Sequence, residues 1–294
     1  MKILGTGLSG LVGSRVVELL KPQYEFENIG HETGIDIADR EGVIQAINDS
    51  DAPILLHFAA KTDVDGCEKD KVLKKDGEAW KINVLGTENV IEGCRQGKKK
   101  IIHISTDFVF DGEKKPQEAY EETDTPNPIN WYGQTKYEAE KLVQSSDLDW
   151  AVVRIVYPYR AFFKRMDFVR SIIYKFQNKE NICAITDHVM TPTFVDDIAF
   201  ALNQFIDKNA EGIYHVVGSQ YITPYDAAKL IAQEFGLDNR LIKKITRKEY
   251  FLRKALRPFN LALKNDKIQR LGVKMRTFEE GLKEVKSQTK KLQS

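Results

Sequence analysis

A glycine-rich turn near the N-terminus constrains the fold more than any other feature of the sequence. Glycines stand at positions 7, 10 and 13, directly after the short apolar run 2–5 and at the start of an apolar helical pattern over 11–20. Glycine allows a tight turn and a close approach of the main chain to a pyrophosphate, which then lies at a helix N-terminus where N–H groups favour negative charge. We therefore expect Gly7, Gly10 and Gly13 to form a dinucleotide-binding turn between a strand and a helix.

Short apolar runs alternate with helical patterns from this turn to about residue 205. The strand candidates are residues 2–5, 24–29, 54–58, 101–105 and 150–155, and the clearest helix candidates are 11–20 and 78–94. This alternation is typical of βαβ units that build a parallel sheet. We predict an α/β fold with a Rossmann-type doubly wound parallel sheet in residues 1–156, to which residues 190–210 return. Residues 157–294 should form mainly a smaller C-terminal α/β substrate-binding lobe.

The composition narrows the class of partner. Lysine and arginine number 44 against 43 aspartates and glutamates, for a net charge of +1, so the chain lacks the basic surplus of a dedicated nucleic-acid binder. The apolar run 54–60 is far shorter than the ~20 residues that cross a bilayer, and no export signal is evident, so we expect no membrane segment and a cytoplasmic protein. The three cysteines form no C-x-x-C pair and the five histidines lack metal-ligand spacing, so we expect neither a disulfide framework nor a metal site.

The end of the second expected strand bears on the choice of nicotinamide cofactor. It contains Asn28 and Gly30 in the region where an acidic residue normally binds the 2′-hydroxyl of an NAD ribose. His31 lies where a cation would favour the additional phosphate of NADP. Glu27 and Asp36 are also near in sequence, so NAD and NADP both remain open.

A tyrosine four residues before a lysine places both side chains on one face of a helix. There the lysine charge, together with an oxidised nicotinamide, can favour tyrosinate and so suit the tyrosine for acid–base catalysis. Of the four such pairs, only Tyr132 and Lys136 follow a long polar stretch, residues 107–130, that leaves a strand ending in the hydroxyls Ser105 and Thr106. We select this pair and interpret the others as ordinary surface or core tyrosines: Tyr137/Lys141, Tyr225/Lys229 and Tyr250/Lys254.

Longer strings of residues surround these positions. They are Ala59-Ala60-x-Thr62-x-Val64-Asp65-x-x-Glu68, Ser105-Thr106-Asp107-Phe108-Val109-Phe110-Asp111-Gly112, Pro128-x-Asn130-x-Tyr132-Gly133-x-Thr135-Lys136 and Arg257-Pro258. With the glycine turn, they resemble the extended short-chain dehydrogenase/reductases, and within these the dTDP-4-dehydrorhamnose reductase family. The resemblance covers nearly the whole chain.

The resemblance implies a role for each matching residue. Thr106 would hold the carbonyl oxygen of a sugar, Tyr132 would protonate it, and Lys136 would bind the nicotinamide ribose and tune Tyr132. NAD(P)H would supply the hydride. The other residues implied at the cofactor are Leu11, Val12, Asp36, Ile37, Ala59, Ala60, Lys61, Thr62 and Asn83, and those implied at a nucleotide-sugar substrate are Thr106, Asp107, Phe108, Tyr157 and Arg257.

The expected reaction is the NAD(P)H-dependent reduction of the C4 ketone of a nucleotide-linked deoxysugar, first among them dTDP-4-dehydrorhamnose. Phe108 stands where the family usually has a tyrosine, so a reductase or epimerase of another nucleotide sugar is an alternative. A second alternative is a non-catalytic, cofactor-binding regulatory subunit similar to the β-subunit of methionine adenosyltransferase. The family also implies a possible homodimer.

Overall fold

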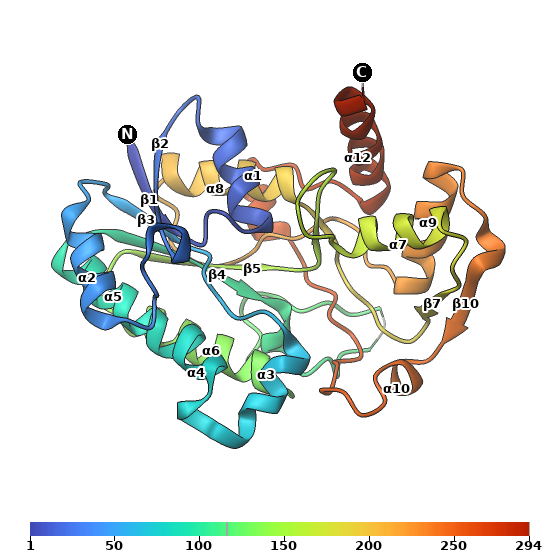
Figure 1. Cartoon of the computed structure of the whole chain (residues 1–294), viewed down its shortest axis with the longest axis horizontal. Helices are drawn as coiled ribbons and strands as arrows, with labels where there is room; N and C mark the ends of the chain where they lie inside the picture. Colours follow the sequence, from blue (N-terminus) through green and yellow to red (C-terminus); the bar gives the residue numbers. More distant parts are fainter. Residues whose placement is uncertain (116, 294) are drawn as a thin grey trace. The chain divides into compact units, whose positions relative to one another are not determined.

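The computed structural model describes residues 1–115 and 117–293, and Figure 1 traces the chain. The chain divides into two compact units. The first unit comprises Met1–Asp111, Thr125–Arg154 and Ala199–Tyr214, and the second comprises Gly112–Asp124, Ile155–Ile198 and His215–Ser294. Within the described residues, no helix combines the length and the apolar character that a membrane span requires.

The first unit is built on a six-stranded sheet. Its strand order is β2 (Glu25–Ile29), β1 (Lys2–Thr6), β3 (Ile54–His57), β4 (Lys100–Thr106), β5 (Trp150–Ile155) and β9 (Gly212–His215). β1 pairs in parallel with β2 and β3, and β3 pairs in parallel with β4. The predicted Rossmann-type α/β fold is confirmed, and all five strand candidates are strands. The strand order reverses between β1 and β3, and ligands of such sheets bind beyond the carboxyl ends at this point.

Helices cover both faces of this sheet. α1 (Leu11–Leu20) and the last turns of α8 (Val195–Asp207) lie on one side in Figure 1, and α2 (Arg40–Asp49), α5 (Gly86–Gln96) and α6 (Trp131–Gln144) lie on the other. The core under α2 and α5 consists of buried aliphatic side chains from helices and strands, among them Leu4, Val43, Ile47, Leu55, Val90 and Ile101. Shorter elements complete the unit: η1 (His31–Thr33), α3 (Val64–Asp70), η2 (Lys71–Asp76), α4 (Glu78–Trp80), η3 (Lys81–Leu85) and η4 (Asp107–Val109).

The second unit contains two small parallel sheets and a set of helices. β6 (Pro158–Tyr159) pairs with β8 (Thr193–Phe194), and β7 (Ile182–Ile185) pairs with β10 (Ile242–Ile245). The helices are α7 (Phe168–Gln177), α9 (Pro224–Phe235), η5 (Asn239–Leu241), α10 (Arg247–Tyr250), α11 (Asp266–Arg270) and α12 (Phe278–Gln293). The ring of Tyr159 contacts those of Phe168, Phe194 and Phe278 at centroid distances of 5.3–5.8 Å, which makes an aromatic core for this unit.

One segment lies in a different unit from the one that the sequence indicated. Residues 112–124 precede the expected boundary at 156 but lie in the second unit. The amide of Asn260 donates to the main-chain carbonyls of Lys115 and Glu118, and the main-chain N–H of Tyr120 donates to Ala262. These bonds satisfy polar main-chain groups of a segment whose described residues form no helix or strand. The segment that rejoins the first unit is Ala199–Tyr214, where the sequence indicated 190–210.

Candidate active site

The glycine turn between β1 and α1 requires glycine for two reasons. Gly7 has φ +68°, in the left-handed region that side chains disfavour, and a Cβ there would lie 2.8 Å from the main-chain nitrogen of Ala59. A Cβ at Gly13 would lie 2.7 Å from the Cα of Leu8. The turn therefore packs directly against the segment that follows β3, and a side chain at either position would separate the two.

The first turn of α1 suits an anion. Its N-cap residue, Gly10, offers no side chain to cap the helix, and the first turn contains no acidic residue. Leu11 and the buried Val12 begin the helix there, so the N-terminal end of the dipole faces no carboxylate of its own helix. The residues present therefore fit the pyrophosphate of a dinucleotide, which the turn would bind through main-chain N–H groups.

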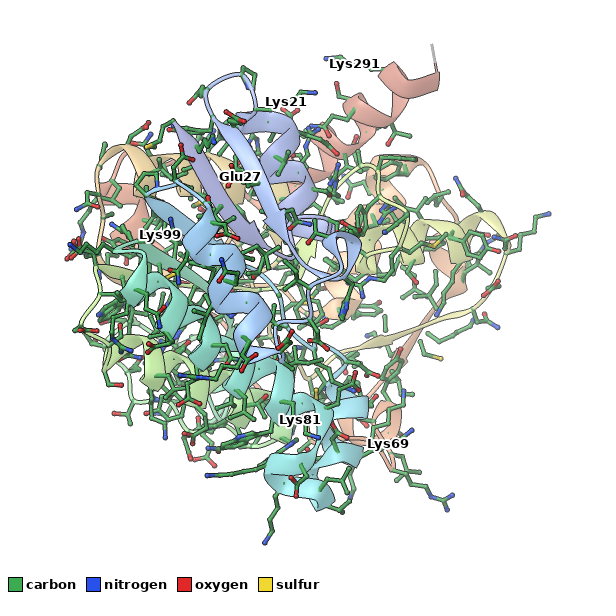
Figure 2. The ribbon with its side chains drawn as sticks, turned by 60° about the vertical axis from the view of Figure 1, so that its left-hand side comes forward. Lys21, Glu27, Lys69, Lys81, Lys99 and Lys291 are labelled. Carbon is green, nitrogen blue, oxygen red and sulfur yellow. The ribbon has the colours of Figure 1, made fainter. Side chains whose placement is uncertain are left out.

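At the end of β2, an amide holds the glycine turn. The Asn28 Oδ1 atom accepts a hydrogen bond from the main-chain N–H of Leu8 at 3.1 Å. The carboxylate of Glu27, labelled in Figure 2, accepts a hydrogen bond from the Ser50 hydroxyl and forms an ion pair with Lys2 at 3.2 Å. His31 is exposed in η1. The interactions of Asn28 and Glu27 do not discriminate between NAD and NADP at this end of the sheet.

Two other residues expected at the cofactor, Asp36 and Ile37, follow η1. Asp36 is exposed and its Oδ1 atom accepts from the main-chain N–H of Ala38 at 2.9 Å. Ile37 is buried in the core of the first unit, where its side chain lies against Gly86. Asp36 is thus the member of this pair that is accessible to a ligand.

Asn83 organises the segment after β3, which contains Ala59, Ala60, Lys61 and Thr62. Its Oδ1 atom accepts from the main-chain N–H of Lys61 at 2.8 Å, and its Nδ2 atom donates to the carbonyl of the same residue at 3.1 Å. The Nδ2 atom also donates to the Thr135 hydroxyl on α6 at 2.9 Å. Asn83 lies in η3, a short π-helix, a form that occurs often at functional sites. It therefore connects the segment after β3 to the helix that carries Tyr132.

His57 belongs to the same buried network. The Thr87 hydroxyl donates to the Asn83 carbonyl at 2.7 Å, so its oxygen accepts from His57 Nε2 at 3.0 Å. His57 Nδ1 is then the acceptor for the Thr6 hydroxyl at 2.7 Å, and the Thr6 oxygen accepts from the Ala59 N–H at 3.2 Å. Burial lowers the pKa of His57 to about 3, which keeps the ring neutral in this role. No local sequence pattern marks this chain of bonds, because its members come from three separate segments, around residues 6, 57–59 and 83–87.

Tyr132, Thr106 and Lys136 are all buried, and they meet at the carboxyl end of β4. The Thr106 side chain lowers the pKa of Tyr132 and so favours the ionised phenol. Lys136 Nζ donates to the Ile104 carbonyl at 2.8 Å and lies 3.3 Å from His103 Nε2, so two contacts bind it to β4. In the three tyrosine–lysine pairs that we did not select, the lysine nitrogen lies over the tyrosine ring, at 5.2–5.6 Å from its centroid.

A glycine allows Tyr132 to come this close to the loop after β4. A Cβ at Gly133 would lie 2.1 Å from the carbonyl oxygen of Phe108, so only glycine permits this approach of α6 to η4. The Asn130 side chain caps α6 by accepting from the Gly133 N–H at 2.9 Å. Two turns after Tyr132, Glu140 binds Arg154 of β5 through both carboxylate oxygens, at 2.9 and 2.7 Å. The helix is thus fixed to β4 and to β5.

Burial sets the ionisation of the tyrosine–lysine pair. It raises the pKa of Tyr132 well above its ordinary value, an effect that the Thr106 side chain partly opposes. It lowers the pKa of Lys136 to about 8, which the charge of Glu140 partly opposes. The sequence led us to expect that the lysine charge favours tyrosinate. In the structure of the protein alone, burial outweighs the other effects on Tyr132 and favours the neutral phenol. The phenol therefore keeps its proton at neutral pH, as a proton donor must.

Asp107 and Phe108 lie next to Thr106 in η4. The Thr106 hydroxyl donates to Asp107 Oδ1 at 2.9 Å, and Asp107 Oδ2 is buried without a hydrogen-bond partner among the described residues. Burial raises the pKa of Asp107 to about 7. The ring of Phe108 packs edge-on against Tyr132, with centroids 5.6 Å apart. Both residues thus contact the tyrosine–threonine pair.

The remaining two predicted substrate residues lie in the second unit. Tyr157 has φ +39°, and its ring contacts His188 and Phe168 at centroid distances of 6.1 and 5.6 Å. The guanidinium of Arg257 lies 4.7 Å from the centroid of the Phe251 ring, and its Nη1 atom donates to the Ala255 carbonyl at 2.8 Å. Their own neighbours hold both side chains in place.

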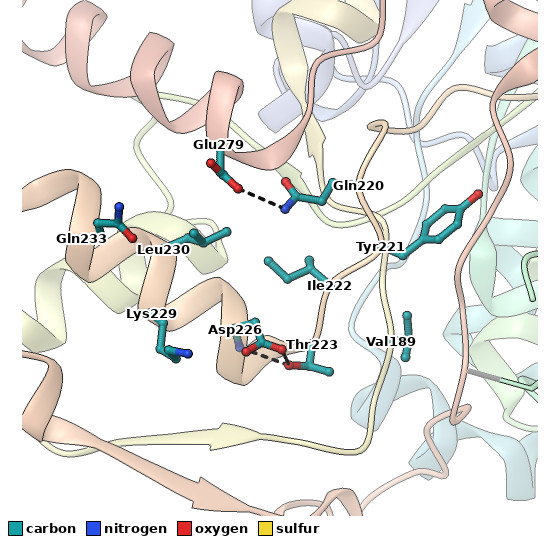
Figure 3. Close-up of a pocket in the computed structure, with 10 residues that line it drawn as sticks. All are labelled: Val189, Gln220, Tyr221, Ile222, Thr223, Asp226, Lys229, Leu230, Gln233 and Glu279. Carbon is teal, nitrogen blue, oxygen red and sulfur yellow. Dashed lines mark hydrogen bonds between the residues drawn. The ribbon is translucent and has the colours of Figure 1, made fainter. Parts of the chain in front are cut away.

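A pocket of about 420 Å³ in the second unit contains none of the predicted site residues. Figure 3 shows two pairs among its polar side chains: Gln220 donates to Glu279 at 3.4 Å, and Thr223 donates to Asp226 at 2.7 Å. Apolar side chains such as Val189 and Leu230 complete the lining. This pocket lacks the hydroxyl, phenol and lysine combination found at the end of β4.

The fold and the glycine turn together define the class of protein. The chain has a Rossmann-type fold with the architecture of the extended short-chain dehydrogenase/reductases. The chain belongs to the RmlD substrate binding domain family, whose model matches residues 1–291. This confirms the resemblance inferred from the sequence motifs.

Solved structures and a curated relative show the range of the family. The chain is similar to dTDP-4-dehydrorhamnose reductase from Bacillus anthracis in complex with NADP, with TM-score 0.89 and 28% identity over 98% of this chain and 99% of that chain. It is similar to a dTDP-4-dehydrorhamnose reductase ortholog from Clostridium acetobutylicum, with TM-score 0.89 and 31% identity over all of both chains. It is also 30% identical to methionine adenosyltransferase 2 subunit beta from Mus musculus, over 96% of this chain and 86% of that protein.

Proposed function

We propose that the protein is an NAD(P)H-dependent oxidoreductase that reduces the C4 ketone of a nucleotide-linked deoxysugar, with dTDP-4-dehydrorhamnose as the substrate. The arrangement of Tyr132, Thr106 and Lys136 carries this proposal. The phenol of Tyr132 is buried and retains its proton, the Thr106 hydroxyl acts on its pKa, and Lys136 follows one helical turn further on. The two reductase structures similar to this chain support the choice of substrate.

Each of the three residues has a distinct task in this proposal. The nicotinamide cofactor, when bound, supplies a hydride to the carbonyl carbon. Tyr132 gives its phenolic proton to the carbonyl oxygen, and Thr106 orients that oxygen by a hydrogen bond. Lys136, whose amino group β4 fixes in place, binds the cofactor ribose. Charge that develops on oxygen is thus met by groups already positioned for it.

Cofactor binding is assigned to the first unit. Gly7, Gly10 and Gly13 with the N-terminus of α1 would hold the pyrophosphate, and Asn83 would keep the segment after β3 in position. Arg257 and Tyr157 of the second unit are proposed to contact the nucleotide sugar. A homodimer remains a proposal from the family, and the cytoplasm is the proposed compartment.

The test is consumption of NADH and NADPH by the purified protein, followed by the loss of nicotinamide absorbance with and without dTDP-4-dehydrorhamnose. Oxidation should depend on the sugar. Tyr132→Phe should lower kcat by about 100-fold or more, because general acid catalysis contributes roughly 10²–10⁴-fold. Tyr137→Phe, five residues further along the same helix, is the matched control and should retain parent activity. Equal activity of the two variants would overturn the role of Tyr132.

The regulatory-subunit alternative is favoured by one observation: the 30% identity to the methionine adenosyltransferase subunit lies between the 28% and 31% identities to the two reductases. It predicts cofactor binding without sugar-dependent oxidation. It also predicts a stable complex with a methionine adenosyltransferase catalytic subunit on size-exclusion chromatography. Cofactor binding and that complex together, in the absence of turnover on nucleotide sugars, would establish this alternative.

A further inference from the structure

We propose that His103 is a positioning residue for Lys136. Its imidazole is the second acceptor that β4 offers to the lysine, and this acceptor fixes the direction of the N–H bond that remains for a ligand. The inference rests on the proposed function, in which Lys136 binds the cofactor ribose, and it names the residue that aims the lysine there. His103 acts through the lysine and has no contact with cofactor or sugar in this proposal.

The amino group of Lys136 has two acceptors among the described residues, and both belong to β4. Its Nζ atom donates to the Ile104 carbonyl at 2.8 Å and lies 3.3 Å from Nε2 of His103. An ammonium group has three donors and no acceptor, so one N–H bond is left for a ligand. With a single acceptor the group could rotate about that one hydrogen bond. The second acceptor removes this rotation, which orients the remaining donor before the ligand arrives.

The contact also determines where the imidazole of His103 carries its proton. A charged lysine donates to Nε2, so this nitrogen has the lone pair and the ring proton is on Nδ1. The Nδ1 atom is buried and has no hydrogen-bond partner among the described residues. A buried donor without a partner destabilises a folded protein, and an apolar side chain of similar size would avoid that cost. The imidazole is therefore explained by the acceptor that it gives to Lys136.

The neighbours of His103 hold its ring in place and keep it neutral. The centroid of the His57 ring lies 5.1 Å away, with 44° between the two ring planes. Both nitrogens of His57 already have hydroxyl partners on Thr6 and Thr87, so the two imidazoles interact by packing. Burial, together with the charge of Lys136, holds the pKa of His103 well below its ordinary value. A neutral imidazole keeps the lone pair that the lysine requires.

Two substitutions of His103 distinguish an acceptor from a side chain that only fills space. His103→Gln keeps an amide oxygen in the region of Nε2, and His103→Leu offers no acceptor. We expect His103→Leu to raise the Kd for NADPH and NADH about 10-fold, which corresponds to ~1.4 kcal/mol. It should also lower kcat at least about 10-fold, because a misdirected lysine leaves the nicotinamide poorly oriented. His103→Gln should remain within about 3-fold of the parent in both quantities, or under ~0.7 kcal/mol.

A double variant shows whether His103 acts through the lysine. Lys136→Met removes the amino group and should raise the Kd for the cofactor at least as much as His103→Leu does. In that background His103→Leu should change the Kd by less than about 2-fold, because the group that it positions is gone. Effects of the two substitutions that multiply would show a merely structural role and overturn the proposal.

Ile102→Val is the matched control for a buried change in β4. Ile102 is buried beside His103, and successive side chains of a strand point to opposite faces of the sheet. This variant should bind both cofactors with the parent Kd. A loss of affinity in Ile102→Val as large as that in His103→Leu would attribute the effect to general damage in the strand and contradict the proposal.

Nitrogen NMR on the parent, labelled with ¹⁵N-histidine and assigned through the main chain, needs neither a variant nor turnover. The ring of His103 should carry its proton on Nδ1 near neutral pH, with a lone pair on Nε2. This measurement decides the question if His103→Leu does not fold. A proton on Nε2 would leave Lys136 without its second acceptor and refute the proposal.

Failure of this inference differs from failure of the proposed function, because cofactor titration and NMR need no sugar. A parent that oxidises NAD(P)H with the sugar, but whose Kd and kcat are unchanged in His103→Leu, refutes the positioning role alone. A parent that shows the expected Kd changes and no sugar-dependent oxidation supports the positioning role and refutes the reductase.

Discussion

The buried ion pair between Glu140 and Arg154 makes the stability of the first unit sensitive to a change of a single atom. The pair joins α6 to β5 through two hydrogen bonds of 2.9 and 2.7 Å, and the two side chains are 0% and 1% exposed. Glu140→Gln keeps the volume but removes the negative charge, so the arginine charge remains in a site from which water is excluded. Breaking one partner of a buried pair costs about 3–5 kcal/mol.

This cost predicts a large shift on heating. For a unit of this size each kcal/mol lowers Tm by roughly 2–4 °C, so Glu140→Gln should lower Tm by about 10 °C. All three tryptophans, Trp80, Trp131 and Trp150, lie in the first unit. Their fluorescence during urea and thermal unfolding therefore measures the stability of this unit.

Two further variants identify the cause of the loss. Lys141→Gln removes an exposed partner of Glu138 on the same helix and should change the free energy of unfolding by less than about 1 kcal/mol. The double variant Glu140→Leu with Arg154→Met removes both charges and should be more stable than Glu140→Gln, because no uncompensated charge remains. A Glu140→Gln protein within about 1 kcal/mol of the parent would refute the reasoning.

Two other perturbations follow from the site. Gly133→Ala should lower kcat at least about 10-fold, because its Cβ would meet the Phe108 carbonyl and move Tyr132 away from Thr106. Gly42→Ala is the control for kinetics and circular dichroism, because the atoms nearest to its Cβ belong to the Asp39 side chain, which can move aside. His57 has a folded pKa of about 3, below that of the unfolded chain, so its contribution to stability is present above about pH 6.5 and is lost as pH falls toward 3. In urea unfolding between about pH 6 and 4, His57→Asn should lose about 1.4 kcal/mol less per pH unit than the parent, and parallel curves would contradict this.

The fold could be predicted because its signals are local. The glycine turn and the alternation of apolar runs each depend on residues that are neighbours in sequence, and both were confirmed. Tyr132 could be selected among four equivalent spacings only because of the loop before it and the strand end at Thr106. The same spacing elsewhere gives lysines stacked on tyrosine rings.

Long-range contacts account for what the sequence did not predict. The place of residues 112–124 depends on Asn260, which is about 140 residues away along the chain. The role of His57 depends on hydroxyls of β1 and α5 that no spacing connects to it. The raised pKa of Tyr132 is caused by burial. Burial depends on how the whole unit packs, so it could not be inferred from the spacing of Tyr132 and Lys136 along the helix.

The position of β9 at the edge of the six-stranded sheet has a consequence for synthesis of the chain. β5 ends at Ile155, and its outer neighbour begins only at Gly212. At about 5–20 residues per second, a ribosome needs several seconds to make the intervening segment. During that time β5 presents an unpaired row of main-chain N–H and C=O groups, which can pair with strands of other chains. The nascent protein is therefore most exposed to aggregation after β5 has emerged and before β9 follows, and a chaperone acting in this interval should improve its yield.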